Sequence, residues 1–166
     1  LIKVTCDHPL VPRGEKNIAY RAARLVMQRT GSDQPVHIHI RKRIPVGAGL
    51  GGGSTDAAAT LIGLNRLLRL RLSTAKLEKI ALSLGADVPF FIRARPARAR
   101  GIGERLHPIR KLARLWMVIV YPGFPVSTAG VFKHVRSKLT KPLVNTSIRS
   151  LEKFDKLAGL LVNDLE

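Results

Sequence analysis

The stretch from Pro45 to Thr55 contains the residue types that could bind a phosphate group. Its glycines crowd together between Gly47 and Gly53, and the hydroxyls of Ser54 and Thr55 follow them. Such a loop leaves successive backbone N–H groups free of side chains. The alternating pattern before it predicts a strand, and the pattern after it predicts a helix. Because a helix N-terminus carries partial positive charge, we expect an anion here, and a nucleotide phosphate fits best.

Three phosphate-loop patterns and one purely structural interpretation compete for this stretch. The P-loop pattern needs a lysine before its Ser or Thr, whereas Gly53 precedes Ser54. The dinucleotide pattern G-x-G-x-x-G is present, but the acidic residue that should follow about 20 positions later is missing. A tight turn that packs a helix on a strand needs fewer glycines and hydroxyls. The third pattern, Pro-x-x-x-Gly-Leu-Gly-Gly-Gly-Ser-Thr, matches residues 45–55 in full.

Asp87 is the acidic residue that could do chemistry beside such a loop. It lies between a helix stop that we expect at Gly85 and the apolar segment Val88–Ile92. A carboxylate beside bound phosphates can accept the proton of a hydroxyl or orient the attacking oxygen. A cap that accepts hydrogen bonds from nearby backbone N–H groups explains the position equally well, so both interpretations stay open.

Strands and helices must hold these residues in place, and the sequence predicts where they lie. We expect strands at residues 1–5 and 36–40, and a buried strand at residues 115–121 that ends at Pro122. Helices are predicted at residues 17–28, after the glycine loop through Leu68, at 74–84, at 128–139 and at 151–161. Asn17 and Ser73 are the expected N-caps, Gly31 and Gly85 the expected helix stops, and residues 101–104 a turn between strands.

Three further features have both a functional and an ordinary interpretation. His37 and His39 share one face of a strand, where a metal pair and a polar face are both conceivable. The basic residues Arg41, Lys42 and Arg43 could contact a phosphate or form a strand end exposed to water. Cys6 is the only cysteine, so no disulfide can form within the chain, which suits a reducing compartment.

Composition narrows the classes of partner. With 166 residues and 45% hydrophobic residues, the chain is long enough for a globular domain with a core. The net charge of +18 would suit nucleic-acid binding, but the basic residues are spread along the chain and few aromatic residues are available for base stacking. No apolar run reaches membrane-spanning length and no signal peptide is apparent. We therefore expect a cytoplasmic protein, a monomer or weak homodimer, that binds no membrane, and nucleic-acid binding is the less favoured alternative.

Several segments taken together resemble the GHMP kinases. The segments are Gly14–Ala23, Pro45–Thr55, Leu84–Phe91 and Asn163–Glu166, with a weaker match from Pro122 to Phe132. Within that family they resemble the members that phosphorylate a hydroxyl of 4-diphosphocytidyl-2-C-methyl-D-erythritol with ATP, in non-mevalonate isoprenoid synthesis. The resemblance implies an α+β GHMP kinase fold. Residues 1–100 would form a ribosomal protein S5 domain 2-like ATP-binding domain, and residues 101–166 an interdomain region and the start of a ferredoxin-like domain.

The resemblance also implies roles for particular residues. Asp87 takes the place of the family's catalytic aspartate, and Ser54 or Thr55 would lie near Mg²⁺ or a phosphate. Phe132 is where an aromatic ring beneath the cytosine is expected, although a phenylalanine that merely packs fits there equally well. The residues implied to bind ATP are Pro45, Val46, Gly47, Ala48, Gly49, Leu50, Gly51, Gly52, Gly53, Ser54 and Thr55.

The chain departs from the family's pattern at both ends. Family members begin with a strand bearing a Pro-Ala-Lys-Ile-Asn motif, whose lysine works beside the catalytic aspartate, and they continue past the block that ends at Glu166. We therefore expect this chain to be the central portion of a longer enzyme and to be inactive, or nearly so, by itself. The alternative is a basic nucleic-acid-binding α/β module, which would need neither the glycine loop nor Asp87.

Overall fold

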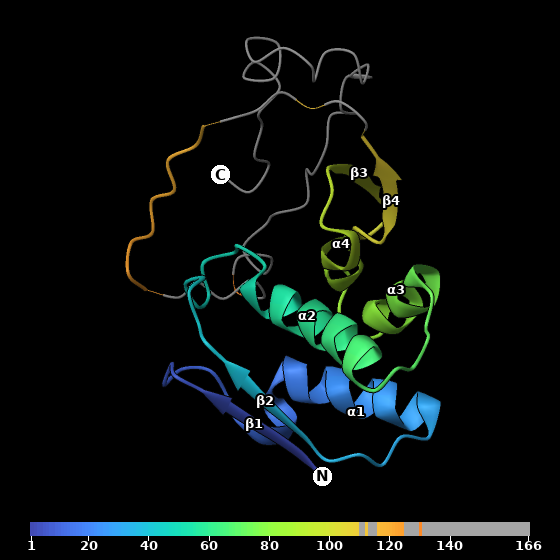
Figure 1. Ribbon diagram of the computed structural model, residues 1–166. Helices are drawn as coiled ribbons and strands as arrows, with labels where there is room; N and C mark the ends of the chain where they lie inside the picture. The colour runs from blue at the N-terminus through green and yellow to red at the C-terminus, as the bar shows by residue number, and fades with distance from the viewer. Residues whose placement is uncertain (110–111, 113–115, 125–129, 131–166) are drawn as a thin grey trace.

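A computed structural model describes residues 1–109, 112, 116–124 and 130 of the chain. In chain order the elements are β1 (Ile2–Cys6), the 3-10 turn η1 (Gly14–Lys16), α1 (Ile18–Thr30), β2 (Val36–Ile40), α2 (Gly52–Leu67), α3 (Thr74–Leu82), α4 (Val88–Arg93), β3 (Ala97–Arg100) and β4 (Arg105–Pro108). This part of the chain contains both helices and strands, with α2, α3 and α4 in succession and then an antiparallel strand pair, which confirms the α+β class (Figure 1). No helix in this described part is long and apolar enough to cross a membrane.

The first two strands form a parallel pair that is connected by α1. They are in register from Ile2 opposite Val36 to Cys6 opposite Ile40, so both strands end at the same edge. The alternating side chains send Val4, Cys6 and Ile40 toward α1, where they are buried with Ala19. The chain that leaves β2 at this edge is the glycine-rich segment, and it returns to the body of the protein as α2 (Figure 1).

The main core lies between the helices. The side chains of α1, α2, α3 and α4 bury one continuous apolar cluster, with Val26, Leu61 and Val88 among its fully buried members. Alanines line the contact between α1 and α2, since Ala22 and Ala23 of one helix and Ala57 and Ala58 of the other are almost inaccessible to solvent. Small side chains let the two helix axes approach closely, which fixes the N-terminus of α2 relative to that of α1.

Capping residues begin and end the helices largely as expected. The Asn17 side chain accepts a hydrogen bond from Ala19 N–H at 2.8 Å, and Gly31 ends α1 with φ at +67°. The Ser73 side chain accepts from Lys76 N–H and begins α3. The stop expected at Gly85 is wrong, because α3 ends at Leu82. The amides of Ser83 and Leu84 already bond three residues back, which tightens and closes the last turn.

The remaining strand predictions had mixed outcomes. Residues 101–104 form the expected turn, which joins β3 to β4 in an antiparallel hairpin. The buried strand expected at residues 115–121 is wrong for the described residues 116–121, which are irregular, and the Trp116 side chain is 99% exposed. The only strand pairs in the described part are β1 with β2 and β3 with β4, so this apolar run has no partner strand there. The helices expected at 128–139 and 151–161 lie outside the described residues, and the division into domains at residue 100 stays a prediction.

Gly63 offers a direct test of the packing around α2. It lies in the middle of the helix, and a Cβ added there would meet nothing within 4 Å. Because alanine restricts the unfolded chain and favours the helix, Gly63→Ala is expected to raise the free energy of unfolding by about 0.5–1 kcal/mol. Urea denaturation followed by circular dichroism measures the change. Destabilisation would show that the surroundings of α2 are tighter than the structure has them.

Candidate functional site

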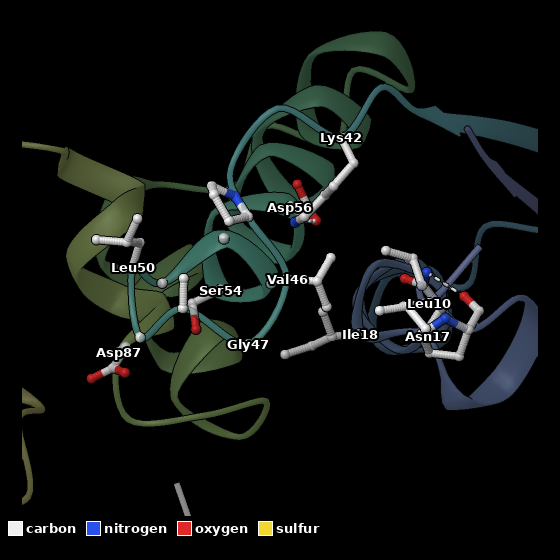
Figure 2. A pocket seen from close by; sticks show the side chains of 18 of the residues that line it. Leu10, Asn17, Ile18, Lys42, Val46, Gly47, Leu50, Ser54, Asp56 and Asp87 are labelled. Atoms are coloured by element: carbon white, nitrogen blue, oxygen red, sulfur yellow. Dashed lines mark hydrogen bonds and ion pairs between the residues drawn. The ribbon is translucent and has the colours of Figure 1, made fainter. Parts of the chain in front are cut away.

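The glycine-rich segment, the start of α1 and Asp87 enclose one cavity of about 560 Å³ (Figure 2). Ser54 and Asp87 lie on one side of it, and Ile18 and Asn17 face them from the other. The cavity is lined by Leu10, Val11, Pro12, Lys16, Asn17, Ile18, Lys42, residues 45–54, Asp56 and Asp87. The N-terminal ends of α1 and α2 thus both border the cavity. Two helix N-termini at one cavity favour a negatively charged ligand.

Glycine is required where the loop enters α2. Gly51 is the N-cap residue, with φ at +67°, and it has no side chain that could bond to the first amides of the helix. The first N–H groups of an α-helix have no partner within the helix, so those of α2 are available to a ligand. A Cβ on Gly51 would lie 2.7 Å from Cζ of Phe91, so the aromatic ring of α4 packs directly against the loop backbone.

The two hydroxyls after the glycines have different surroundings. The Thr55 hydroxyl donates a hydrogen bond to the Gly51 carbonyl at 3.0 Å and is therefore used within the helix. Ser54 is half-buried and lines the cavity. Of the two residues that the sequence predicted to contact a phosphate or Mg²⁺, only Ser54 lines the cavity.

Asp87 stands at the N-cap position of α4, but its side chain makes no capping hydrogen bond. In the described residues, the interpretation as a cap for nearby amides is therefore wrong. The residue is exposed at the cavity wall beside Ser54 (Figure 2). The turn of the β3–β4 hairpin approaches it, since a Cβ on Gly103 would lie 3.7 Å from Asp87 Oδ1. The carboxylate is thus free to contact a ligand in the cavity.

The basic residues before the loop do not behave alike. Arg41 and Arg43 are exposed, whereas only 6% of the Lys42 side chain is accessible to solvent. Lys42 Nζ lies 2.6 Å from Asp56 Oδ2 in the second turn of α2. The backbone N–H of Lys42 donates to Asp7 Oδ1 at 2.8 Å, and this hydrogen bond is the main cause that holds the pKa of Asp7 below its usual value.

Two other features complete the surroundings of the site. The hydroxyl of Tyr121 donates to the Val46 carbonyl at 3.2 Å, which brings this side chain to the glycine loop. His37 and His39 both hydrogen-bond to the Thr5 hydroxyl at 2.9 Å, as expected of a polar strand face. No group of three or more metal-binding side chains occurs among the described residues. Phe132 lies outside the described residues.

Comparison with known proteins agrees with this geometry. Residues 17–95 match the GHMP kinases N terminal domain, a range that contains the N-cap of α1, the glycine loop and Asp87. Residues 17–95 are therefore a GHMP kinase N-terminal domain. It is 48% identical over 165 residues to a protein of Geobacter sp. (strain M21) and 44% identical over 165 residues to one of Syntrophus aciditrophicus (strain SB). Both relatives are named 4-diphosphocytidyl-2-C-methyl-D-erythritol kinase.

A solved structure extends the agreement to three dimensions. The crystal structure of a 4-(cytidine 5'-diphospho)-2C-methyl-D-erythritol kinase matches 98% of this chain with a TM-score of 0.72 and 36% sequence identity. The alignment covers 58% of that structure, and the chain spans 59% of the length of the two relatives. The GHMP kinase fold expected from the motifs is thereby confirmed.

Sequence reasoning missed part of the cavity. Asn17 was expected only as a helix cap, and Leu10, Val11 and Pro12 were not singled out, yet all of them line the cavity. Asp56 was not singled out. Its position in the second turn of a helix that begins with a phosphate-loop pattern was the signal that could have identified it.

Proposed function

We propose that the chain binds ATP with its phosphates against the glycine loop, and that it carries the ATP-binding part of a small-molecule kinase. The observation that supports this most strongly is that Asp87 and the N-terminus of α2 line the same cavity. The alternative interpretation of Asp87, as a cap, would have had its carboxylate bonded to nearby backbone N–H groups, and it makes no such bond. Phosphoryl transfer needs a group that accepts the hydroxyl proton next to the groups that bind the phosphates. Asp87 and the N-terminus of α2 have these positions in the proposal.

The proposed acceptor is a hydroxyl of 4-diphosphocytidyl-2-C-methyl-D-erythritol, and the product would enter isoprenoid precursor synthesis. The names of the two relatives and of the solved structure support this substrate. Phe132 is the residue that we propose lies beneath the cytosine ring. A cytoplasmic location and a monomer or weak homodimer stay predictions.

In the proposed mechanism the protein contributes position and charge. The amides at the start of α2 bind the phosphate oxygens, and the two helix N-termini stabilise their negative charge. The oxygen of the acceptor hydroxyl bonds to the γ-phosphorus while the bond from the γ-phosphorus to the β-phosphate oxygen breaks, which leaves ADP. Asp87 accepts the proton that this hydroxyl loses. The side chains of Ile18 and Val46 form an apolar part of the wall around the proposed phosphates.

Mg²⁺ belongs to the proposal because the donors that line the cavity suit it. The Ser54 hydroxyl lines the cavity beside the proposed phosphates, and oxygen ligands, from the protein and from the phosphates, are those that Mg²⁺ prefers. We propose that Ser54 holds the ion together with the phosphates. When bound, Mg²⁺ neutralises phosphate charge.

Calorimetric titration of the chain with MgATP tests the proposal. Saturable binding of one nucleotide per chain is expected, together with protection of the loop amides from hydrogen exchange. A matched titration with duplex RNA at two salt concentrations addresses the alternative. No response to MgATP combined with tight RNA binding that falls steeply with salt would contradict the kinase and favour a nucleic-acid-binding module.

A further inference from the structure

A largely buried ion pair, which no sequence motif predicts, connects the two ends of the glycine loop. Residues 41–51 leave β2 and enter α2 without regular structure. Lys42 lies at the beginning of this segment and Asp56 just past its end, 14 positions later, and their charged atoms are 2.6 Å apart. The pair therefore connects the two ends of the loop directly (Figure 2).

The surroundings of the pair indicate a fixed position. The Lys42 side chain is 6% exposed and that of Asp56 23%. A Cβ on Gly52 would lie 3.0 Å from Lys42 Nζ, so the ammonium group packs against the first residue of α2. The backbone N–H of Lys42 donates a hydrogen bond to the side chain of Asp7, the residue that follows β1. Lys42 is thus bound to three elements at once: the end of β1, the end of β2 and the start of α2.

The Tyr121 hydroxyl bonds to the Val46 carbonyl and the Phe91 ring packs against Gly51, but the glycines of the loop leave its backbone free to turn when its ends are not held. Gly47, Gly49 and Gly51 have positive φ, and side chains that could restrict the backbone are absent at these positions. Because glycine gains the most conformational freedom when released, a loop that is free at one end would have to be ordered again when a ligand binds. A pair that fixes the separation of the two ends removes that cost beforehand.

From this geometry we infer that Lys42 and Asp56 are positioning residues, a clamp that keeps the glycine loop in the conformation that binds phosphate. The inference deepens the proposed function and rests on it. Lys42 acts through the loop, because its ammonium is buried against Asp56 and Gly52. A clamp and a purely electrostatic role predict different results. If the pair acted only through its charges, loss of the cation would weaken the binding of an anionic ligand and loss of the anion would strengthen it.

The first measurement does not involve a nucleotide. Hydrogen exchange of residues 43–51 is compared, by mass spectrometry, between the unliganded parent chain, Lys42→Met, Asp56→Asn and the double variant. The clamp predicts faster exchange of this segment in all three variants. Glu78→Gln is the matched control, since Glu78 pairs with Arg93 between α3 and α4 and is 22% exposed, close to the value for Asp56. It is expected to leave the exchange of residues 43–51 unchanged.

The second measurement is the dissociation constant of MgATP from calorimetry. Each single variant is expected to bind MgATP about tenfold more weakly, and the double variant no more weakly than the worse single variant, because the same clamp is lost in all of them. Tighter binding by Asp56→Asn, or additive losses in the double variant, would overturn the clamp. An equal loss in Glu78→Gln would also overturn it.

If the single variants do not fold, the double variant still allows the test. It leaves no orphaned buried charge, which is the usual cause of severe destabilisation when one partner is removed. Unchanged exchange at residues 43–51 in the folded double variant rejects the clamp. Failure of the parent chain to bind MgATP would count against the proposed function, whereas the exchange measurement would still decide for or against the clamp.

Discussion

Replacing Asp87 by asparagine is expected to abolish most of the turnover of the gene product that contains this chain while leaving nucleotide binding nearly intact. Asparagine has the shape of aspartate but cannot accept the hydroxyl proton. Loss of a positioned proton acceptor lowers rates by about 100- to 10,000-fold. The dissociation constant of MgATP should stay within a factor of about two or three, because the bound phosphates lie against the loop amides and are not held by Asp87.

The measurement for Asp87→Asn is single-turnover phosphorylation of 4-diphosphocytidyl-2-C-methyl-D-erythritol, with MgATP binding determined separately. Asp33→Asn is a suitable control, since Asp33 lies between α1 and β2 and does not line the cavity. It should behave like the parent. Near-normal turnover of the Asp87 variant would remove this residue from catalysis. A large loss of MgATP affinity would instead assign it to the metal or the phosphates.

Local chemistry explains what the sequence could predict. Alternation from Val36 to Ile40, followed by glycines and then an amphipathic pattern, can satisfy backbone hydrogen bonds only as strand, loop and helix. Asn17 and Gly31 are residues whose side chain, or lack of one, suits a single position at a helix end. These signals act over a few residues, and the structure confirms each of them.

Contacts between distant residues were beyond such reasoning. The pairing of Lys42 with Asp56 depends on the angle at which α2 leaves β2, which is set by alanine packing between α1 and α2. The ring of Phe91 reaches Gly51 because the short apolar run after Asp87 is a helix, and periodicity cannot distinguish a buried helix from a strand over so few residues.

The apolar run at 116–121 shows the converse limitation. Its composition is that of a buried strand, but a strand also needs a neighbour with free N–H and C=O groups, and composition says nothing about whether one is available. In the described part of the chain only Tyr121 of this run makes a hydrogen bond, to Val46. Tyr121 therefore contacts the glycine loop, while the side chains of residues 116–120 are exposed and belong to no sheet of the described part.

Gly51→Val is expected to give the largest loss of nucleotide binding among substitutions in the loop. Valine would have to adopt φ near +67°, which costs an L-residue about 1–2 kcal/mol or more, and its Cβ would lie 2.7 Å from Phe91 Cζ. The backbone has to move away from the ring, and this turns the first amides of α2 from the phosphates. We expect MgATP affinity to fall by about 100-fold or more, because several charge-assisted hydrogen bonds are lost together.

Strain and position are separated by a matched substitution at Gly31. This residue has the same φ of +67° and ends α1 outside the cavity, and a Cβ there would meet nothing within 4 Å. Gly31→Val should therefore lower the free energy of unfolding while the dissociation constant of MgATP stays at the parent value. If both variants lost affinity equally, weakened binding would reflect general destabilisation. If Gly51→Val still bound MgATP like the parent, the phosphates would have to lie elsewhere, and the assignment of Asp87 as the neighbouring proton acceptor would fall with it.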